Sequence, residues 1–152
     1  MSSVNLRIVG IYARISVPFF GPIPLATVAD LLVAAGLVDT NFTYAFNTPS
    51  ANGGLSLLTA NYNWTMPPPT LSGATRPAGL YSVTENTTPS PTGVVTAWQY
   101  YIERPLASDP TYRKLVSKTP IGGGFKFVNQ SEPLQANDEV IFRTVALALS
   151  PA

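Results

Sequence analysis

Apolar and polar positions alternate along the beginning of the chain, between Val4 and Val17. An alternation with a period of two, together with many β-branched residues, is typical of a strand with one buried face. The pattern therefore predicts one long strand at the centre of a sheet. Gly10 interrupts it, and a glycine inside a strand indicates a bulge that changes the buried face between Ile8 and Ile11.

A helical period replaces this alternation after Thr27. Thr27 and Asp30 have the spacing of a capping box, with Asp in the place of the usual Glu. The apolar positions that follow are spaced i, i+3, i+4 and i+7, which predicts a helix of about two turns with one face against a sheet. Gly36 is expected just past its end, where helices commonly stop at glycine. The apolar positions are Val28, Leu31, Leu32 and Ala35.

Beyond Asp39 the apolar runs are short and are separated by turn residues, which predicts strands. The 15 prolines lie almost wholly between the expected elements. A chain of 152 residues suits one domain, so residues 1–152 are expected to form a single β-rich domain. The predicted fold class is α+β, mostly β, with an antiparallel or mixed sheet and one short helix. A β-sandwich with one helix is the alternative. The expected strands cover residues 42–46, 55–64, 80–84, 94–102, 124–129 and 139–149.

The strand expected at residues 94–102 is rich in aromatic side chains. Trp98, Tyr100 and Ile102 fall on one of its faces, which we expect to belong to the core. Closer to the C-terminus, Asn137 and Asp138 predict a tight turn, because short polar side chains bond to nearby backbone groups there.

Two segments, Trp98-Gln99-Tyr100-Tyr101 and Leu134 to Arg143, together with the order of strand, helix and strands, resemble the transcobalamin C-terminal-like β-grasp domain. The resemblance implies a β-grasp fold and suggests a corrinoid as ligand. The chain departs from the family pattern in two places. Glu103-Arg104-Pro105 stands where the family has Asn-Gly, and Asn137-Asp138 replaces its Gly-Asp turn, so no ligand-contacting residue is carried over.

Charge is scarce, and this narrows the possible chemistry. Only 11% of the residues are charged, against about 25% in typical domains, and Arg76 is the single charged residue between Thr40 and Thr84. The chain has neither His nor Cys, which removes the imidazole base, the thiol nucleophile and thiolate ligands for zinc. We therefore predict no enzymatic activity, no cofactor and no metal site.

Catalysis without these groups would depend on carboxylates or on a lysine. Asp138 and Glu139 are adjacent, and neighbouring residues on a strand point to opposite faces, so they are not expected to work as an acid and base pair. The other candidates are Glu85, Glu103, Asp109, Glu132, Lys114 and Lys118.

The nine basic residues are scattered, and the net charge is only +1. A nucleic-acid surface normally needs a stripe of basic residues, so no nucleic-acid partner is expected. No run approaches the roughly 20 apolar residues of a membrane helix, and the start of the chain lacks the features of a signal peptide. We expect a protein made in the cytoplasm without a membrane partner, which is also compatible with a virion component.

A neutral surface favours contact with other proteins over chemistry. The predicted function is a non-enzymatic structural or assembly protein, namely a virion subunit of a capsid, its decoration or a tail, or a similar lattice subunit. Its expected partners are other copies or other structural proteins. The candidate contact residues are Phe19 and Phe20 in a proline-rich loop, then Trp64, Met66, Pro67 and Pro68, and finally the two termini, residues 1–3 and 150–152.

The alternative function is a module that binds a glycan or another small ligand. Aromatic rings beside Asn and Thr side chains could supply stacking surfaces and hydrogen bonds for such a ligand. The rings considered are Tyr62, Trp64, Tyr81, Trp98, Tyr100 and Tyr101.

Overall fold

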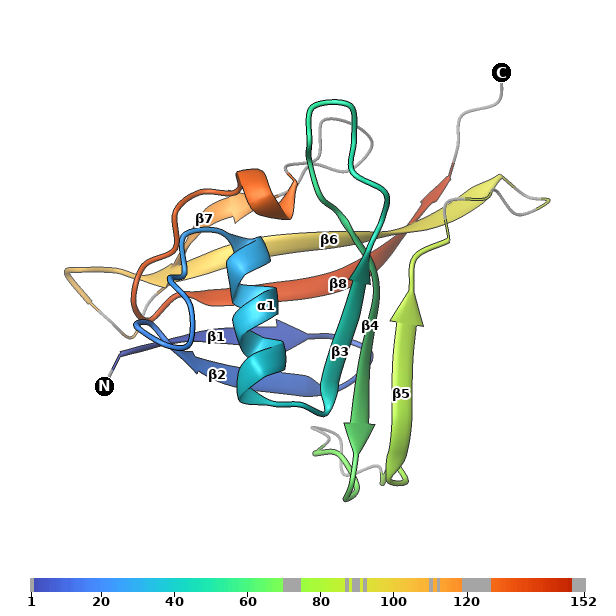
Figure 1. Cartoon of the computed structure of the whole chain (residues 1–152), viewed down its shortest axis with the longest axis horizontal. Coiled ribbons are helices and arrows are strands. Elements are labelled where there is room, and N and C mark those ends of the chain that lie inside the picture. The colour runs from blue at the N-terminus through green and yellow to red at the C-terminus, as the bar shows by residue number, and fades with distance from the viewer. Residues whose placement is uncertain are drawn as a thin grey trace.

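The computed structural model describes residues 2–69, 75–86, 88, 91, 93–109, 111, 113–118 and 127–148, with only the backbone of 113–118, 147 and 148. Within these residues the chain forms a five-stranded sheet in the order β2-β1-β8-β6-β7 and a three-stranded sheet in the order β3-β4-β5 (Figure 1). The elements are β1 Ser3–Ile8, β2 Ala13–Pro18, α1 Val28–Val38, β3 Phe42–Phe46, β4 Leu57–Trp64, β5 Gly79–Thr84, β6 Val94–Pro105, β7 Arg113–Lys118, the 3-10 turn η1 Val128–Gln130 and β8 Glu139–Ala148.

The first apolar segment forms a hairpin, so the prediction of one long strand with a bulge was wrong. β1 and β2 pair antiparallel, with Leu6 opposite Ile15, and the chain reverses between them. Gly10 has a φ of 103° and Tyr12 a φ of 61°. Positive φ at these two positions turns the chain back, and glycine reaches this region without steric cost.

The helix begins where the sequence predicted and ends later. The Thr27 side chain accepts a hydrogen bond from the Asp30 backbone N–H, and the Asp30 carboxylate accepts one from the Thr27 N–H, which completes the capping box. The helix continues to Val38, so Gly36 lies inside it rather than after it. A Cβ at Gly36 would lie 3.3 Å from the Tyr44 ring, so the missing side chain allows α1 to pack closely on β3.

The five-stranded sheet has the connectivity of a β-grasp. A hairpin is followed by a helix, and the last strand, β8, pairs parallel to β1, with Leu6 beside Val140. β6 pairs antiparallel to the other side of β8, and β7 completes the sheet. The small sheet is an insertion between α1 and β6. This architecture confirms the predicted class, α+β and mostly β.

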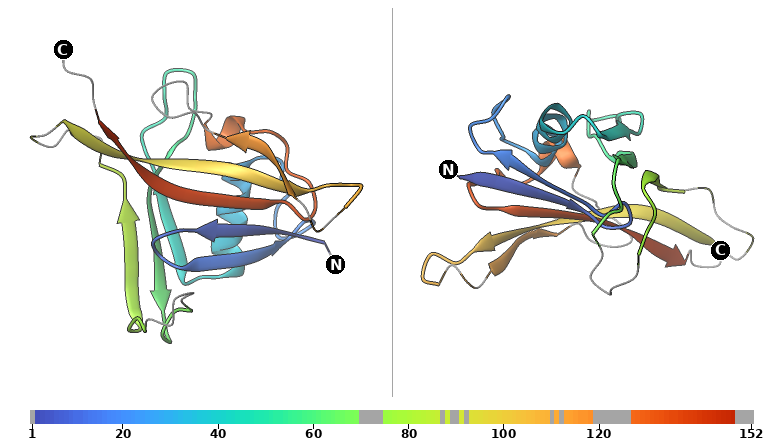
Figure 2. Two further views of the ribbon diagram at one scale, coloured as in Figure 1. Left: turned by 180° about the vertical axis from the view of Figure 1, so that it is seen from behind. Right: turned by 90° about the horizontal axis from the view of Figure 1, so that it is seen from below.

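The small sheet and α1 cover the same face of the five-stranded sheet, as the view from below in Figure 2 shows. Trp98, Tyr100 and Ile102 point into the layer between them and are buried, as their alternation predicted. One continuous cluster of buried apolar residues includes both sheets and the helix. Its largest fully buried members include Phe42, Phe142, Leu6, Leu31, Leu32 and Leu57.

The later strands mostly agree with their predicted ranges. β3 matches, and β4, β5, β6 and β8 differ from the prediction by a few residues at their ends. β7 was not predicted at all. The strand expected at 124–129 falls partly outside the described residues, and its described end belongs to η1 rather than to a strand.

Candidate interaction site

The loop after β2 presents two stacked phenylalanine rings. The ring centroids of Phe19 and Phe20 lie 5.1 Å apart with an angle of 18° between the planes. Phe20 is 92% exposed, the highest value among the exposed large apolar residues of the described chain. Gly21 N–H donates to the Pro18 carbonyl at 3.0 Å, and Phe19 N–H donates to the Ser2 carbonyl at 3.0 Å. These two bonds fix the loop that holds the rings.

The two phenylalanines also line a shallow apolar depression, which is formed by residues 19–26. Leu25 is buried, and Ile23 packs on the core cluster. The depression therefore rests on the rigid core. Pro18, Pro22 and Pro24 restrict φ along this loop, so little backbone entropy is left to lose when a partner binds.

The second group of predicted contact residues lies at the end of β4. The Trp64 Nε1–H donates to the Ile11 carbonyl at 2.8 Å, and the ring is half-buried against Tyr62. Met66 is 64% exposed and Pro67 is exposed, but Pro68 is buried. Pro68 is thus not available to a partner in the folded chain.

The structure does not bring the two groups together. Phe19 follows Pro18, which pairs with Ser3 at one end of the β1–β2 hairpin. Trp64 bonds to Ile11 in the turn at the other end. The predicted contact residues therefore form two separate surfaces. Of the termini, Ser2 and Ser3 lie beside the Phe19 loop, whereas Met1 and residues 150–152 are outside the described residues.

Aromatic side chains gather between the β1–β2 turn and the small sheet. Tyr12 and Tyr81 meet edge to face with centroids 5.6 Å apart, and the Arg76 guanidinium lies 5.7 Å from the Tyr12 ring. The Tyr62 hydroxyl donates to the Asp39 carboxylate at 2.5 Å. Burial and this hydrogen bond to a carboxylate raise the pKa of Tyr62 to about 12.

Two of the rings considered for ligand stacking belong to the core instead. Trp98 is 7% exposed, and its Nε1–H donates to the Leu58 carbonyl at 3.0 Å. Tyr100 is also buried, and burial raises the pKa of its hydroxyl. Tyr62, Trp64, Tyr81 and Tyr101 are half-buried and reach the surface in part.

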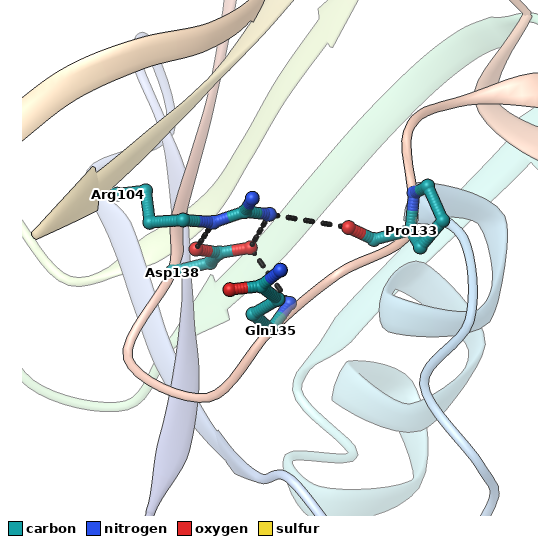
Figure 3. Close-up of polar contacts among 4 residues, drawn as sticks. All are labelled: Arg104, Pro133, Gln135 and Asp138. Atoms are coloured by element: carbon teal, nitrogen blue, oxygen red, sulfur yellow. Dashed lines mark hydrogen bonds and ion pairs between the residues drawn. The ribbon is translucent and has the colours of Figure 1, made fainter. Parts of the chain in front are cut away.

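The buried acid of the chain is Asp138, and Figure 3 shows its partners. The Arg104 Nε–H and Nη2–H donate to its two carboxylate oxygens at 2.8 and 2.9 Å. Gln135 N–H donates to the same carboxylate at 2.8 Å, and Arg104 Nη2–H also donates to the Pro133 carbonyl. The hydrogen bond to Asp138 raises the pKa of Arg104. This arrangement connects the end of β6 to the turn before β8.

The other acidic groups considered for catalysis also have structural partners. Glu85 accepts from the Asn47 amide at 2.9 Å and from Trp98 N–H at 3.3 Å. Glu139 lies 3.7 Å from the Arg14 guanidinium. The Asp109 carboxylate accepts hydrogen bonds from the backbone N–H and the hydroxyl of Thr111 in the same loop. Among the described residues, no three acidic side chains come together as a metal site would require.

The face of the five-stranded sheet away from α1 carries side-chain contacts that were not predicted from the sequence. Arg7 and Arg14 lie opposite each other there on β1 and β2. Gln99 on the same face is fully buried and accepts from Arg143 Nε–H and Nη2–H at 3.2 and 3.1 Å. The register of β6 against β8 places these two residues opposite each other, and a correct register would have been needed to find the contact.

Within the part of the chain that the structure describes, no helix combines the length and the apolar character needed to cross a membrane. Comparisons of the chain with known protein families, with curated protein sequences and with solved structures give no match.

Proposed function

We propose that this chain is a non-enzymatic structural subunit that acts through protein contacts, in a virion capsid, its decoration, a tail or a comparable lattice. The observation that carries the proposal is the Phe20 ring, which is 92% exposed and stacked on Phe19. Exposed apolar patches often mark contact sites, and this ring lines the apolar depression formed by residues 19–26. The partner is a second copy or another structural protein.

The physical basis is the gain from covering this ring. Burying a phenylalanine side chain is worth about 1.5–3 kcal/mol, and the proline-rich loop loses little entropy on binding. The low charge of the chain also leaves little electrostatic repulsion between neighbouring copies. These properties favour close packing of subunits.

Sedimentation velocity over a range of concentrations tests the proposal, with the chain alone and with structural proteins encoded beside it. Phe20→Ser should weaken association about tenfold or more, since 1.4 kcal/mol is a factor of ten. Leu37→Ser is the matched control, because Leu37 is exposed at 57% on α1, away from the loop. A chain that stays monomeric and binds none of these proteins would contradict the proposal.

A module for glycans or other small ligands is the second candidate. The observation that favours it is Trp64, whose ring is half-buried beside Tyr62 and close to the exposed Met66. Flat rings at a surface can stack on sugars.

A further inference from the structure

The outer edge of β5 differs from the other sheet edges of the described chain. β5, the last strand of the small sheet, has the sequence Gly-Leu-Tyr-Ser-Val-Thr. It contains no charged residue and no proline, and its pairing with β4 has no register shift. Leu80 on this strand is 68% exposed. Proteins usually protect edge strands with charges, prolines or bulges, because an open edge can pair with another strand.

The other three edges carry such protection. β2 carries Arg14 and ends at Pro18. Three of the six residues of β7 are Lys or Arg. β3 has a register shift between Ala45 and Phe46, and α1 packs beside it. Figure 1 shows β5 on the side of the small sheet away from α1. Just beyond its end, Asn86 pairs with Thr96 of β6 in an isolated antiparallel bridge, so the edge that no described strand covers is that of β5 itself.

The hydrogen-bond pattern identifies the groups that face outward. Glu85 N–H, just after β5, donates to the Leu58 carbonyl on β4 at 2.9 Å. Because peptide groups in an antiparallel pair point alternately toward and away from the partner, Val83 and Tyr81 also bond to β4. The N–H and C=O groups of Leu80, Ser82 and Thr84 therefore point away from it. The side chains of these three residues are exposed as well.

We infer that this edge pairs antiparallel with β5 of a second copy, which joins two small sheets into one continuous sheet. The inference rests on the proposed function and adds to it a second contact, separate from the one at Phe20. A two-fold axis at Ser82 places Ser82 opposite its own copy and Leu80 opposite Thr84 of the second copy. Each copy then donates from the N–H groups of these three residues, and every outward-facing group of the strand is paired.

A second copy fits this edge because β5 carries no charge and its residues can pair with those of an identical antiparallel strand. Symmetric pairing brings like residues close together, and β5 has no charge that would repel its copy. In the same register Tyr81 lies opposite Val83 of the second copy, an aromatic and β-branched pair that sheets favour. Both side chains are half-buried on the inner face in the single chain, and the pairing would cover them further.

Disulfide cross-linking provides a direct test, since the natural chain has no cysteine. Directly opposite residues in such a pair have Cα atoms about 5.5 Å apart, within the range that a disulfide spans. Ser82→Cys should therefore give a covalent dimer on oxidation of the purified chain. Ala45→Cys, an exposed position on the opposite edge strand, should not. Equal yields from both variants would overturn the inference.

The register can be checked in the same way. When Leu80→Cys and Thr84→Cys chains are mixed, the two variants should form a disulfide with each other more efficiently than either variant forms one with its own copy. Preferential cross-linking of either variant with itself would contradict the axis at Ser82.

An added charge tests the edge without a covalent bond. Ser82→Lys places two cations opposite each other and should raise the dissociation constant at least tenfold in sedimentation equilibrium, whereas Ala45→Lys should leave it unchanged. Ser82 is exposed and its peptide groups do not bond to β4, so the unfolding midpoint of the variant should stay near that of the natural chain.

The outcomes separate this inference from the proposed function. Association that Phe20→Ser abolishes but Ser82→Lys does not would overturn the β5 contact and leave the structural role supported. A chain that neither pairs with itself nor binds neighbouring structural proteins would contradict both. Loss of association with Ser82→Lys, together with the selective cross-link, would support both.

Discussion

Arg104 and Asp138 form a two-point ion pair that connects β6 to the turn before β8 (Figure 3). The Asp138 side chain is fully buried and the Arg104 side chain is 17% exposed. The turn also bonds to β1, because Asn137 N–H donates to the Ser3 carbonyl and Asn5 N–H to the Asp138 carbonyl. The ion pair therefore stabilises the point where the first and last strands of the sheet meet.

Asp138→Ala should destabilise the chain by about 3–5 kcal/mol, because it leaves the Arg104 guanidinium without its partner in a mostly buried position. Urea unfolding monitored by circular dichroism measures this change. Arg14→Ala is the control, since its pair with Glu139 has a separation of 3.7 Å and Arg14 is 67% exposed. That variant should lose less than about 1 kcal/mol. Similar losses in the two variants would contradict the structural role of the Asp138 pair.

Gly10→Ala should destabilise the chain more than Gly53→Ala. Both glycines have positive φ, which disfavours alanine, but a Cβ at Gly10 would lie 2.8 Å from the Val83 side chain, while a Cβ at Gly53 meets nothing within 4 Å. Left-handed backbone costs a residue with a Cβ about 1–2 kcal/mol, and the close contact adds to this at Gly10. Thermal and urea unfolding of the two variants give the difference. Equal losses would argue against the close approach of the hairpin turn to β5.

Stability should fall with rising pH above about 10, because the folded chain holds the proton of Tyr62 more tightly than the unfolded chain does. The pKa of this hydroxyl is about 12 in the folded state, against an ordinary value of 10.0. The stabilisation of the folded state that follows from this difference in pKa is complete below pH 10 and is lost as the pH rises toward 12. Unfolding midpoints between pH 8 and 12 measure it. Tyr62→Phe should reduce this part of the decline, and an unchanged slope would contradict the assignment.

Tryptophan fluorescence distinguishes the ligand-binding candidate from the structural one. The chain has two tryptophans, and Trp98 is buried, so a stacking ligand should affect the emission of Trp64. If a glycan or corrinoid binds there, Trp98→Phe should retain the change on titration and Trp64→Phe should lose it. A flat titration across a panel of such ligands counts against the binding module.

The fold class and many element positions could be predicted from the chain because local signals determine them. The capping box at Thr27 and Asp30 defines the helix start, and alternation places Trp98 and Tyr100 in the core. The hairpin was missed since its apolar pattern continues through the turn, and only Gly10 signals a reversal. β7 was missed because its cationic residues do not show a clear alternation.

The candidate contacts were harder to predict than the fold. Sequence identifies Phe19 and Phe20 as an apolar loop, but it does not show that Pro68 is buried or that Trp64 lies at the far end of the hairpin. The Arg104 and Asp138 contact depends on the register of β6 against β8, and the open β5 edge depends on strand order. Long-range pairing decides these features, and local residue patterns do not contain it.

The parallel pairing of β1 with β8 also has a consequence for how the protein folds as it leaves the ribosome. Asn5 pairs with Glu139, which is made much later, so the central ladder of the sheet cannot form until β8 has emerged. Until then the hairpin and helix expose an apolar surface to solvent, and such surfaces can aggregate. Formation of the complete five-stranded sheet should therefore be a slow, late step of folding that chaperones assist.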